Sequence, residues 1–424
     1  MKKFLPGDVE FIGASITSPK KDAEIGFRAS IIHIDIYEDI DAPTMMCDIL
    51  IKDDINMVSN LPIVGEEVVT LVFSTPGFER VRMQFNVYDV TNESTTSDLS
   101  NKVYVLRCVS AESITNAKVA VDNSYSGMID TFIPEILTSN LSTQKRIFIE
   151  PCKGSQTIVF PAGIQPLQAI DLLRRQAVSK KYSSSSFVFF ENQAGFNFVT
   201  VEALLDAGHR AQQINALRKY TYSDNNRIEG REFAFLRTMI NFEVQNRSDN
   251  IHKLQSGAFR TDVSTFDMVT KEFATSSYDL SNQLFKTTDR ATKLVGTAGH
   301  IRSAINQQLI PKTLYMPKRA DVENFVHEAA GPRNMFSMLL GETTVIAHIY
   351  GDSSLKVGDV INCSFKTPEV FSATDAKASK NKPRKNESNI TGNYLVTKLR
   401  HMISNKVNYH YTQSVNLVKM GASA

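Results

Sequence analysis

Residues 1–112 alternate apolar and polar side chains with the period of two that marks half-buried antiparallel strands. The stretch ASIIHIDIYED (29–39) places three isoleucines on one face, and VRMQFNVYDV (81–90) repeats the alternation. CDILIKD, EEVVTLVFS and KVYVLRCVSAE continue the pattern between turn-rich segments. Several short strands at this spacing predict a barrel or sandwich over the first 112 residues.

Beyond this β region the apolar period changes to that of helices. Apolar residues recur at helical spacing in 124–139 and in 165–182, where Pro166 stands at a suitable first-turn position. SSFVFFENQAGFNFVTVEALL (185–205) predicts a hairpin with the turn NQAG, leading into a short helix. We therefore predict a compact α/β module at residues 113–205, inserted between β regions.

Strand patterns return in the second half of the chain. Strand candidates at 231–246 and 256–273 predict that residues 206–280 start a second β-barrel. Residues 281–341 lack strand periodicity and end in a helical segment that a Gly-Pro pair interrupts, which predicts a helical and loop-rich insertion. Four further strand candidates in 342–424 supply the remainder of the second barrel.

Two stretches near opposite ends of the chain share one pattern, SNLPIVGEEVVTLVFST (59–75) and SSLKVGDVINCSFKT (353–367). Each runs Leu, one residue, an aliphatic residue, Gly and an acid, and then an alternating strand. Further matches follow downstream, pairing Tyr88, Val90 and Thr91 with Tyr394, Val396 and Thr397, and SNKV at 100–103 with SNKV at 404–407. Matches in one order predict that a single barrel is used twice.

The second copy is longer because a polar, Lys-rich stretch at 366–392 separates its strands. Few apolar residues and many charges predict a mobile loop there, and such insertions cost little closure entropy. The predicted fold class is α+β and predominantly antiparallel β, with two similar tube-type β-barrels, an inserted α/β module and a helical and loop-rich insertion.

A doubled barrel has a physical use in a symmetric assembly. A cyclic trimer of such chains presents six similar barrels around its axis, so it can face a six-fold ring on one side and a three-fold partner on the other. An exposed edge strand of each barrel would then be paired across the subunit boundary and protected from aggregation.

The composition bears on which partners the chain binds and on where it is made. Lys and Arg total 47 against 45 for Asp and Glu, so the net charge of +2 gives no footprint for tight duplex binding. The four cysteines are scattered without a CxxC pair, which predicts buried, reduced thiols in a chain made in a reducing cytoplasm. The first residues lack a continuous apolar stretch and no run reaches the ~18 apolar residues of a membrane helix, so we expect a protein that is soluble when made.

The sequence contains only incomplete versions of known catalytic and ligand-binding motifs. HEAAG at His327 has Gly331 where a zinc-protease helix needs its second histidine, which favours solvated helix residues. GTAGH (296–300) lacks the Lys-Ser/Thr of a phosphate loop and is predicted to be a turn. The acid-rich segment 38–54 predicts a turn and a strand rather than a calcium loop, and the basic segment 174–181 predicts a helix end. No catalytic, cofactor-binding or metal-ligating residue is predicted.

Four stretches, LPIVGEEVVTLVF, SLKVGDVINCSF, GNYLVTKLRH and YTQSVNLVKM, resemble the baseplate hub proteins of contractile-tailed bacteriophages, which are related to the hub portion of type VI secretion spike proteins. The layout of barrel, α/β insertion and second barrel also fits this family. The resemblance implies a homotrimer in the virion tail baseplate, assembled in the host cytoplasm. It would carry the membrane-puncturing spike protein below and join hexameric tail tube and baseplate tube-initiator proteins above. DNA would pass through its central channel without specific binding, and the chain would not insert directly into a membrane.

We therefore expect a structural hub that is not an enzyme and needs no cofactor. Two alternatives stay open. One is a tail-associated cell-wall hydrolase whose active site forms across distant segments in 113–205 or 281–340. The other is a receptor-binding tail protein, which the complete absence of Trp disfavours for glycan ligands.

Overall fold

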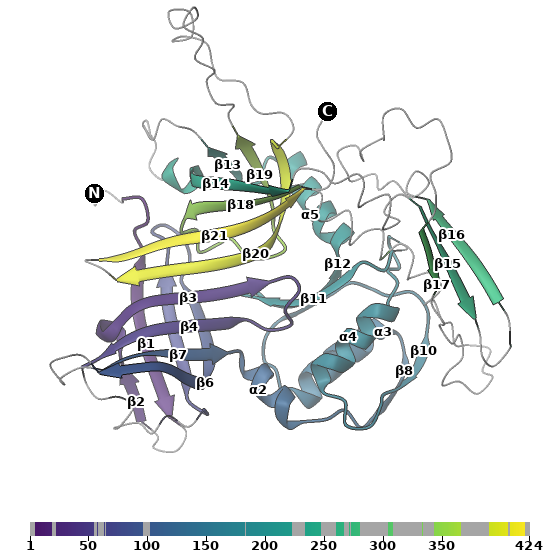
Figure 1. Ribbon diagram of the computed structural model, residues 1–424, viewed down its shortest axis with the longest axis horizontal. Coiled ribbons are helices and arrows are strands. Elements are labelled where there is room, and N and C mark those ends of the chain that lie inside the picture. Colours follow the sequence, from purple (N-terminus) through teal and green to yellow (C-terminus); the bar gives the residue numbers. More distant parts are fainter. Residues whose placement is uncertain are drawn as a thin grey trace, which may run out of the picture.

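The computed structural model describes residues 5–18, 23–54, 57, 63, 65–95, 102–182, 184–222, 234–246, 260–266, 271, 273–279, 304–307, 333, 343–365, 390–405 and 408–419. Antiparallel strands dominate these residues, as the sequence predicts, and thirteen of the strands belong to one sheet. Figure 1 shows this sheet curving through the molecule beside a module that contains most of the helices. The coarse expectation of a mainly antiparallel β protein with some helix is confirmed.

The strands of the first group are β1 (Glu10–Ser18), β2 (Ala23–Gly26), β3 (Ile31–Asp39), β4 (Met46–Asp53), β5 (Val68–Ser74), β6 (Val81–Thr95) and β7 (Lys102–Val109), with a 3-10 turn, η1 (Arg28–Ser30), before β3. The second group has β13 (Lys219–Tyr222), β14 (Met239–Asn246), β18 (Thr343–Tyr350), β19 (Val360–Phe365), β20 (Gly392–Asn405) and β21 (Tyr409–Lys419), with η3 (Ala234–Arg237) before β14. Because β20 pairs with β3, the two groups form one continuous sheet.

Both groups use the same strand order. The first runs β3-β4-β7-β6-β5 across the sheet and the second runs β14-β18-β21-β20-β19. Numbered along the chain, each set of five strands has the spatial order first, second, fifth, fourth, third, and every pair in both sets is antiparallel. The groups differ at the next strand, because β1 is antiparallel to β5 whereas β13 is parallel to β19.

Two β-bulges also recur at equivalent places. The first strand of each set has one extra residue against its neighbour, Ile32 in β3 and Ile240 in β14. The fourth strand of each set has another, Tyr88 in β6 and Thr397 in β20. A bulge bends its strand and increases the local twist, so the two shared bulges bend both sets at equivalent points. Each set also has a register shift of its own, between Thr91 and Ser94 in β6 and between Val244 and Asn246 in β14.

The glycine turns that begin the repeated pattern are equivalent as well. Gly65 and Gly358 have φ angles of 94° and 90°, the left-handed region that favours glycine. In each turn, the carbonyl of the acidic residue just before the strand accepts a bond of 2.9 Å from the fourth strand, from the amide of Val87 in one case and of Val396 in the other. Val87 and Val396 therefore occupy equivalent positions.

This register corrects the matches predicted from the sequence. Tyr88 is equivalent to Thr397 and not to Tyr394, so that series of matches is wrong by three residues. The side chains agree with the correction, because Tyr394 is fully buried while Tyr88 is 39% exposed. The match of 100–103 with 404–407 is also wrong for the residues that the structure describes. Lys102 begins β7, the fifth strand of its set, whereas Ser404 lies near the end of β20, the fourth strand of its set.

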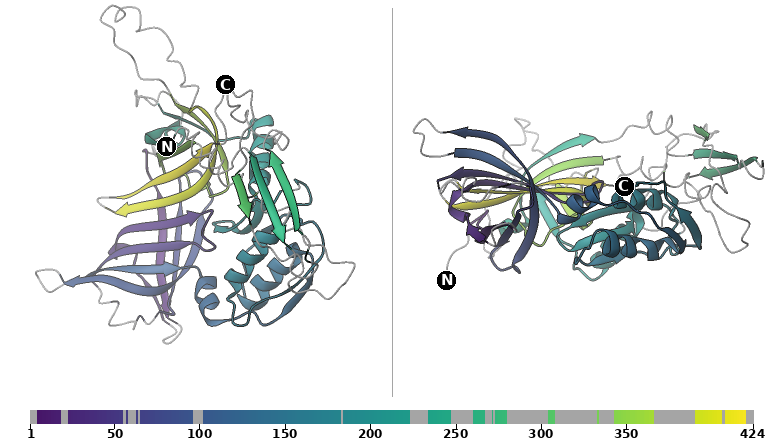
Figure 2. Two further views of the ribbon diagram at one scale, coloured as in Figure 1. Left: turned by 45° about the vertical axis from the view of Figure 1, so that its right-hand side comes forward. Right: turned by 90° about the horizontal axis from the view of Figure 1, so that it is seen from below.

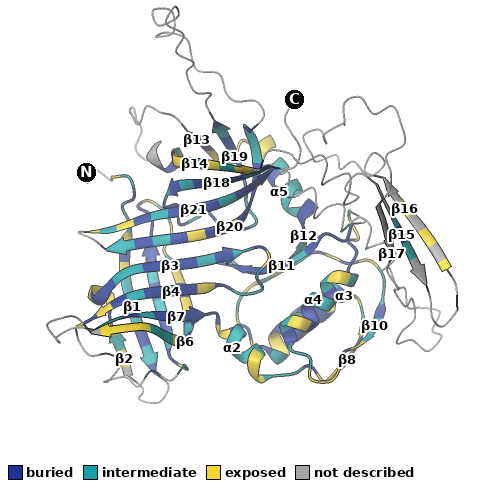
Figure 3. Cartoon of the chain, in the orientation of Figure 1, coloured by how far each residue is buried: buried dark blue, intermediate teal, exposed yellow. Residues whose placement is uncertain are grey.

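The inserted module combines two small sheets with helices. Its elements are α2 (Ala111–Lys118), β8 (Ser124–Gly127), α3 (Ile129–Glu135), the π-helix η2 (Ile136–Asn140), β9 (Ile147–Ile149), β10 (Gln156–Val159), α4 (Pro166–Gln176), β11 (Phe187–Asn192), β12 (Gly195–Thr200) and α5 (Val201–Gln213). Pro166 is the first residue of α4, as predicted, because a missing N–H costs nothing there. The hairpin predicted at 185–205 is confirmed as β11–β12, and the short helix predicted after it is confirmed as the start of α5. Figure 3 shows the buried face of α4 turned toward the module interior.

The strands β15 (Arg260–Phe266), β16 (Phe273–Asp279) and β17 (Ala304–Gln307) form a sheet of their own. Two of them fall in the 206–280 segment expected to start the second barrel, but among the described strands of that segment it is β13 and β14 that join the large sheet. Figure 2 shows this small sheet beside the module in both views. Apart from Arg333, the helix predicted at 320–341 lies outside the described residues. Residues 366–389 of the predicted loop 366–392 also lie outside them.

Three apolar cores hold the fold together. One fills the first strand group, one the second group and one the module. The first core also takes in Ile403 and Tyr411 from the hairpin of the second group, both fully buried. Burial of a side chain of this size contributes about 1.5–3 kcal/mol, so the hairpin β20–β21 stabilises both groups.

The four cysteines are free and buried, as predicted. Cys47, Cys108 and Cys363 lie on strands β4, β7 and β19. Burial raises the pKa of each thiol, which keeps these cysteines protonated and unreactive. Within the described residues, no helix combines the length and the apolar character needed to cross a bilayer.

Candidate functional site

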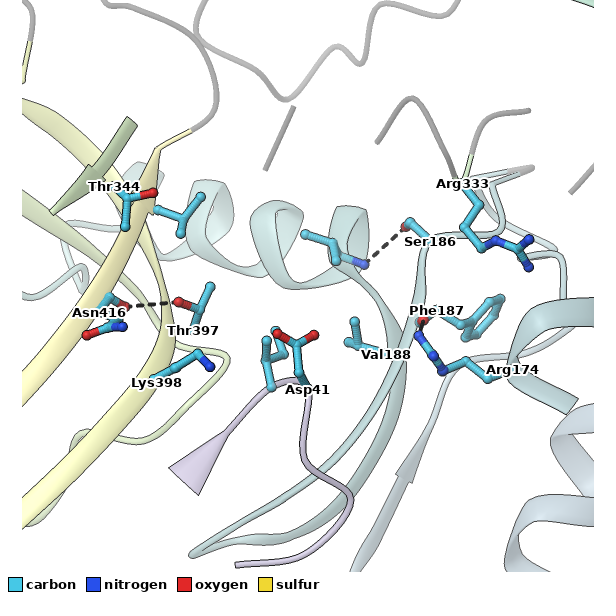
Figure 4. Close-up of a pocket in the computed structure, with 13 residues that line it drawn as sticks. Asp41, Arg174, Ser186, Phe187, Val188, Arg333, Thr344, Thr397, Lys398 and Asn416 are labelled. Atoms are coloured by element: carbon cyan, nitrogen blue, oxygen red, sulfur yellow. Dashed lines mark hydrogen bonds between the residues drawn. The ribbon is translucent and has the colours of Figure 1, made fainter. Parts of the chain in front are cut away.

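A cavity of about 350 Å³ lies where the two strand groups and the module meet. Its wall combines the turn after β3, helix α4, the start of β11, and the strands β18, β20 and β21. Figure 4 shows Asp41, Arg174 and Lys398 around this cavity, with Ser186 and Arg333 at one side. The cavity is thus a product of the junction between parts of the chain that are far apart in sequence.

Arginines gather on the module side of this cavity. Arg174 is paired with Asp171 at 2.6 Å and donates to the carbonyl of Phe187 at 3.3 Å. Arg333 donates to the carbonyl of Arg175 at 2.8 Å. Burial, and then repulsion from Arg174 and Arg175, lowers the pKa of Arg333. Arg174 and Arg175 belong to the helix end predicted at 174–181, and the structure places that end against the junction.

Buried carboxylates beneath the cavity are held by hydroxyl groups. The side chains of Ser184 and Ser186 both donate to Glu202, and burial raises the pKa of this carboxyl. Glu150 accepts bonds of 2.7 Å from both the backbone amide and the hydroxyl of Thr200, the N-cap residue of α5. Both acids are more than nine-tenths buried and their oxygens are occupied, so they organise the start of α5 rather than face a substrate. Sequence reasoning did not find this network, although the serine run before β11 was a signal for it.

Glu38 at the end of β3 joins three parts of the chain. Its buried carboxylate accepts a bond of 2.9 Å from the amide of Val357 and one of 3.2 Å from the amide of Gln193. Asn192 returns a bond of 2.9 Å to the carbonyl of Val357. The module hairpin, the first strand group and the turn before β19 are therefore locked together by one acid.

Lys145 forms a second joint. Its ammonium group lies 2.6 Å from both Glu112 and Glu191. Glu191 also accepts a bond of 2.6 Å from the hydroxyl of Ser110 and one of 3.0 Å from the amide of Met45. Burial opposes the charge of Lys145, but the two glutamates outweigh it and raise its pKa. Burial also raises the pKa of Glu191, although Lys145 acts against it. This cluster fixes the module to the first strand group.

The third joint lies where the two strand groups pair. Arg400 on β20 binds Asp35 on β3 through two bonds of 2.9 and 2.8 Å, and Lys398 binds Asp39 at 2.8 Å. Burial opposes the ionised form of Asp35, but hydrogen bonds from His33 and Arg400 outweigh it and lower its pKa. Charge pairs thus reinforce the backbone ladder between the groups.

The catalytic lookalikes do not come together. Segment 38–54 forms the end of β3, a turn and β4, as expected. Within the described residues, no group of three or more His, Cys, Asp or Glu side chains is placed to hold a metal ion. His327 and the segment 296–300 lie outside the described residues. The described geometry therefore supports joints between separate parts of the fold.

Comparison with known proteins identifies the fold as that of tail proteins. No protein-family model matches the chain, and no curated protein matches its sequence. Among solved structures, a tail protein from Neisseria meningitidis MC58 is similar with a TM-score of 0.56 and 8% identity, covering 96% of both chains. The 43 kDa tail protein of prophage MuSo2 from Shewanella oneidensis has a TM-score of 0.54 and 10% identity, covering 96% of this chain and 98% of its own. The predicted resemblance to phage tail proteins is therefore confirmed for the fold.

Proposed function

We propose that this chain is the hub of a contractile phage tail. In this proposal, three copies form a ring that joins the hexameric tail tube to the trimeric membrane-puncturing spike. The observation that carries the proposal is the repeat of one strand order with two shared bulges, on a fold that prophage tail proteins also have. We interpret the two strand groups as two copies of one tube-type barrel.

The two repeated strand groups explain how a three-fold ring could match a six-fold tube. Two equivalent units in each chain give six units in a closed ring of three chains. Such a ring matches a six-fold tube on one face through its repeated units. On the other face it matches a three-fold spike through features that occur once per chain, such as the inserted module.

The hub would act in the virion baseplate after assembly in the host cytoplasm, with tube-initiator proteins as further partners. The net charge of +2 favours a channel through which DNA passes without specific binding. The joints at Glu38, Lys145 and Arg400 suit a rigid connector, because each crosses between parts that load would otherwise separate.

The proposal is tested by the mass and shape of the full chain. Light scattering of the purified protein alone should give three times the chain mass of 47.3 kDa, or, if the ring forms only with its partner, the combined mass of three such chains and three spike chains once the spike protein is added. Electron micrographs viewed along the axis should then have six similar lobes around a pore. A monomer under all these conditions would overturn the proposal.

We also propose that the hub acts without catalysis. The buried acids Glu150 and Glu202 have their oxygens occupied by hydroxyl and amide donors. A zymogram of the purified chain on cell-wall material should therefore stay unchanged. Clearing that disappears in the variant Glu202→Gln, with the fold retained, would support the hydrolase instead.

A further inference from the structure

We propose that strand β6 of one copy pairs with strand β14 of the next copy, and that this edge-to-edge contact closes the ring. The inference rests on the proposed ring of identical chains and names the surfaces that would form it. It starts from a contact already present inside one chain, between β20 and β3.

The internal contact depends on the bulge in β20. Before the bulge, β20 pairs with β19 through Leu395. After the bulge at Thr397, the strand pairs with β3 at seven positions, from Lys398 opposite Asp39 to Ser404 opposite His33. The other edge of β20 is occupied by β21 throughout, so β19 and β3 share one edge on the two sides of the bulge. Figure 1 shows β20 between β21 and β3.

Strand β6 is arranged like β20, but among the described strands it lacks a partner that corresponds to β3. It pairs with β5 up to Asn86, has the equivalent bulge at Tyr88, and continues to Thr95 with β7 on one edge, with a further register shift between Thr91 and Ser94 that β20 lacks. On its other edge, none of the described strands pairs with the part beyond the bulge. The hydroxyl of Thr91 is buried there without a hydrogen-bond partner. Its equivalent in β20 is Arg400, which binds across to β3.

Strand β14 is the equivalent of β3, the strand that β20 binds. β3 uses one edge for β4 and the other for β20, whereas β14 uses one edge for β18 and its other edge has no ladder among the described strands. The exposed residues on β14 include Ile240, which is 41% exposed. A long unpaired edge with apolar exposure is an association site unless something covers it.

The equivalences also give the register. Arg400 lies opposite Tyr37, and Tyr37 and Asn246 occupy equivalent places opposite Met46 and Thr344 once the second bulge of β14, between Val244 and Asn246, is counted. Thr91 of one copy should therefore lie opposite Asn246 of the next. Because the contact joins two different edges, every copy has one edge of each kind to offer, and the series of contacts closes into a ring of three when each copy is rotated by one third of a turn from the last.

A cysteine pair tests this register in the full-length chain. Directly opposite residues in an antiparallel ladder are ~4.5–5.5 Å apart between Cα atoms, which suits a disulfide. The double variant Thr91→Cys/Asn246→Cys should give covalent bands of two and three chains on non-reducing gels. The control Thr91→Cys/Ile240→Cys keeps the same strands but shifts one site by roughly 20 Å along β14, at about 3.3 Å per residue. It should give at least tenfold less crosslinking, and His33→Cys/Ser404→Cys should crosslink within one chain.

Light scattering on the same samples separates the possible outcomes. Crosslinked trimers support both the strand pairing and the ring. A trimer without Thr91–Asn246 crosslinks overturns the strand pairing and leaves the proposed ring intact. A variant pair at the other sheet edge, Glu24→Cys/Asn246→Cys, that crosslinks in its place would identify β2 as the partner strand and overturn the inference. A monomer without crosslinks overturns both proposals.

Discussion

Tyr88 and Thr397 are the extra residues of two equivalent β-bulges, each in the fourth strand of its group. Beyond Thr397 the strand leaves β19 and pairs with β3, which joins the two groups into one sheet. Beyond Tyr88 the strand leaves β5 in the same way. The bulge is therefore the device that lets one unit reach the next, and its repetition connects the fold of one chain to the geometry of an assembly.

Replacing Glu38 should destabilise the whole junction. In Glu38→Ala, the buried amide of Val357 and the partly buried amide of Gln193 lose their acceptor, and a buried unsatisfied donor costs about 1–3 kcal/mol. We expect the free energy of unfolding in urea to fall by about 2–4 kcal/mol. The matched control is Glu93→Ala, because Glu93 is 46% exposed and pairs with Lys102 at the surface. The control should change stability by less than about 1 kcal/mol, and equal effects of the two variants would contradict the assigned role of Glu38.

Replacing Lys145 should leave two buried carboxylates without their cation. Removing one partner of a buried ion pair costs about 3–5 kcal/mol, and the 32% exposure of Lys145 places Lys145→Met at or below the lower end of this range. The variant should also gain a pH dependence. Without Lys145 the pKa of Glu191 rises further above its unfolded value, so the stability deficit should shrink from pH 8 to pH 5 as the carboxyl takes up a proton.

Urea unfolding of Lys145→Met at several pH values checks this prediction. The control Lys181→Met removes a lysine that is 59% exposed and pairs with Asp206 at 2.7 Å. It should cost much less stability than Lys145→Met at pH 8, and its cost should stay the same across this pH range. A deficit of Lys145→Met that is the same at pH 5 and pH 8 would contradict the role of the buried glutamates.

The sequence predicted the elements better than the connections between them. Alternating apolar residues identified β3 and β6, and Pro166 identified the start of α4, because these signals are local. The repeat was also detectable, yet its register was wrong by three residues at Tyr88. Strand alternation repeats every two residues and does not encode which amide pairs with which carbonyl.

The candidate site was beyond the reach of sequence reasoning for a related reason. Glu38 and Val357 are 319 positions apart, and nothing in the sequence near Glu38 indicates that it accepts the amide of Val357. An acid at a strand end is common in turns, so segment 38–54 indicated only a turn and a strand. A buried polar network becomes visible once the backbone groups that it satisfies are placed.

Gly208 should be essential to the packing of α5 on the second strand group. A Cβ atom at this position would lie 2.5 Å from the Cβ of Val360 on β19, so Gly208→Ala forces the helix away from the sheet. Overpacking of this kind costs about 1–3 kcal/mol, which thermal unfolding would detect. The matched control is Gly13→Ala on β1, where a Cβ meets nothing within 4 Å. The control should be neutral or slightly stabilising, and a neutral Gly208→Ala would contradict this close contact of α5 and β19.

The ion pair between Asp35 and Arg400 should make the joint of the two strand groups sensitive to acid. The pKa of Asp35 is lowered in the folded state, so its contribution is complete above the unfolded value of about 3.9 and is lost as the pH falls through the lower folded value. In Arg400→Met, part of this contribution disappears. Because Arg400 is 44% exposed, we expect a loss of at most about 1 kcal/mol near pH 7.

The difference between the parent chain and Arg400→Met should stay constant from pH 7 to pH 5 and shrink as the pH falls below about 4. It should vanish below the lowered folded pKa of Asp35, where this carboxyl is protonated in both proteins. Urea unfolding at each pH measures this difference, and Lys102→Met, which removes a surface pair away from the joint, is the control. Arg400 also lies 5.5 Å from the ring centre of Tyr37. A difference that persists unchanged to pH 2 would mean that Arg400 stabilises the joint through this ring contact, because a cation–π contact does not depend on the charge of Asp35.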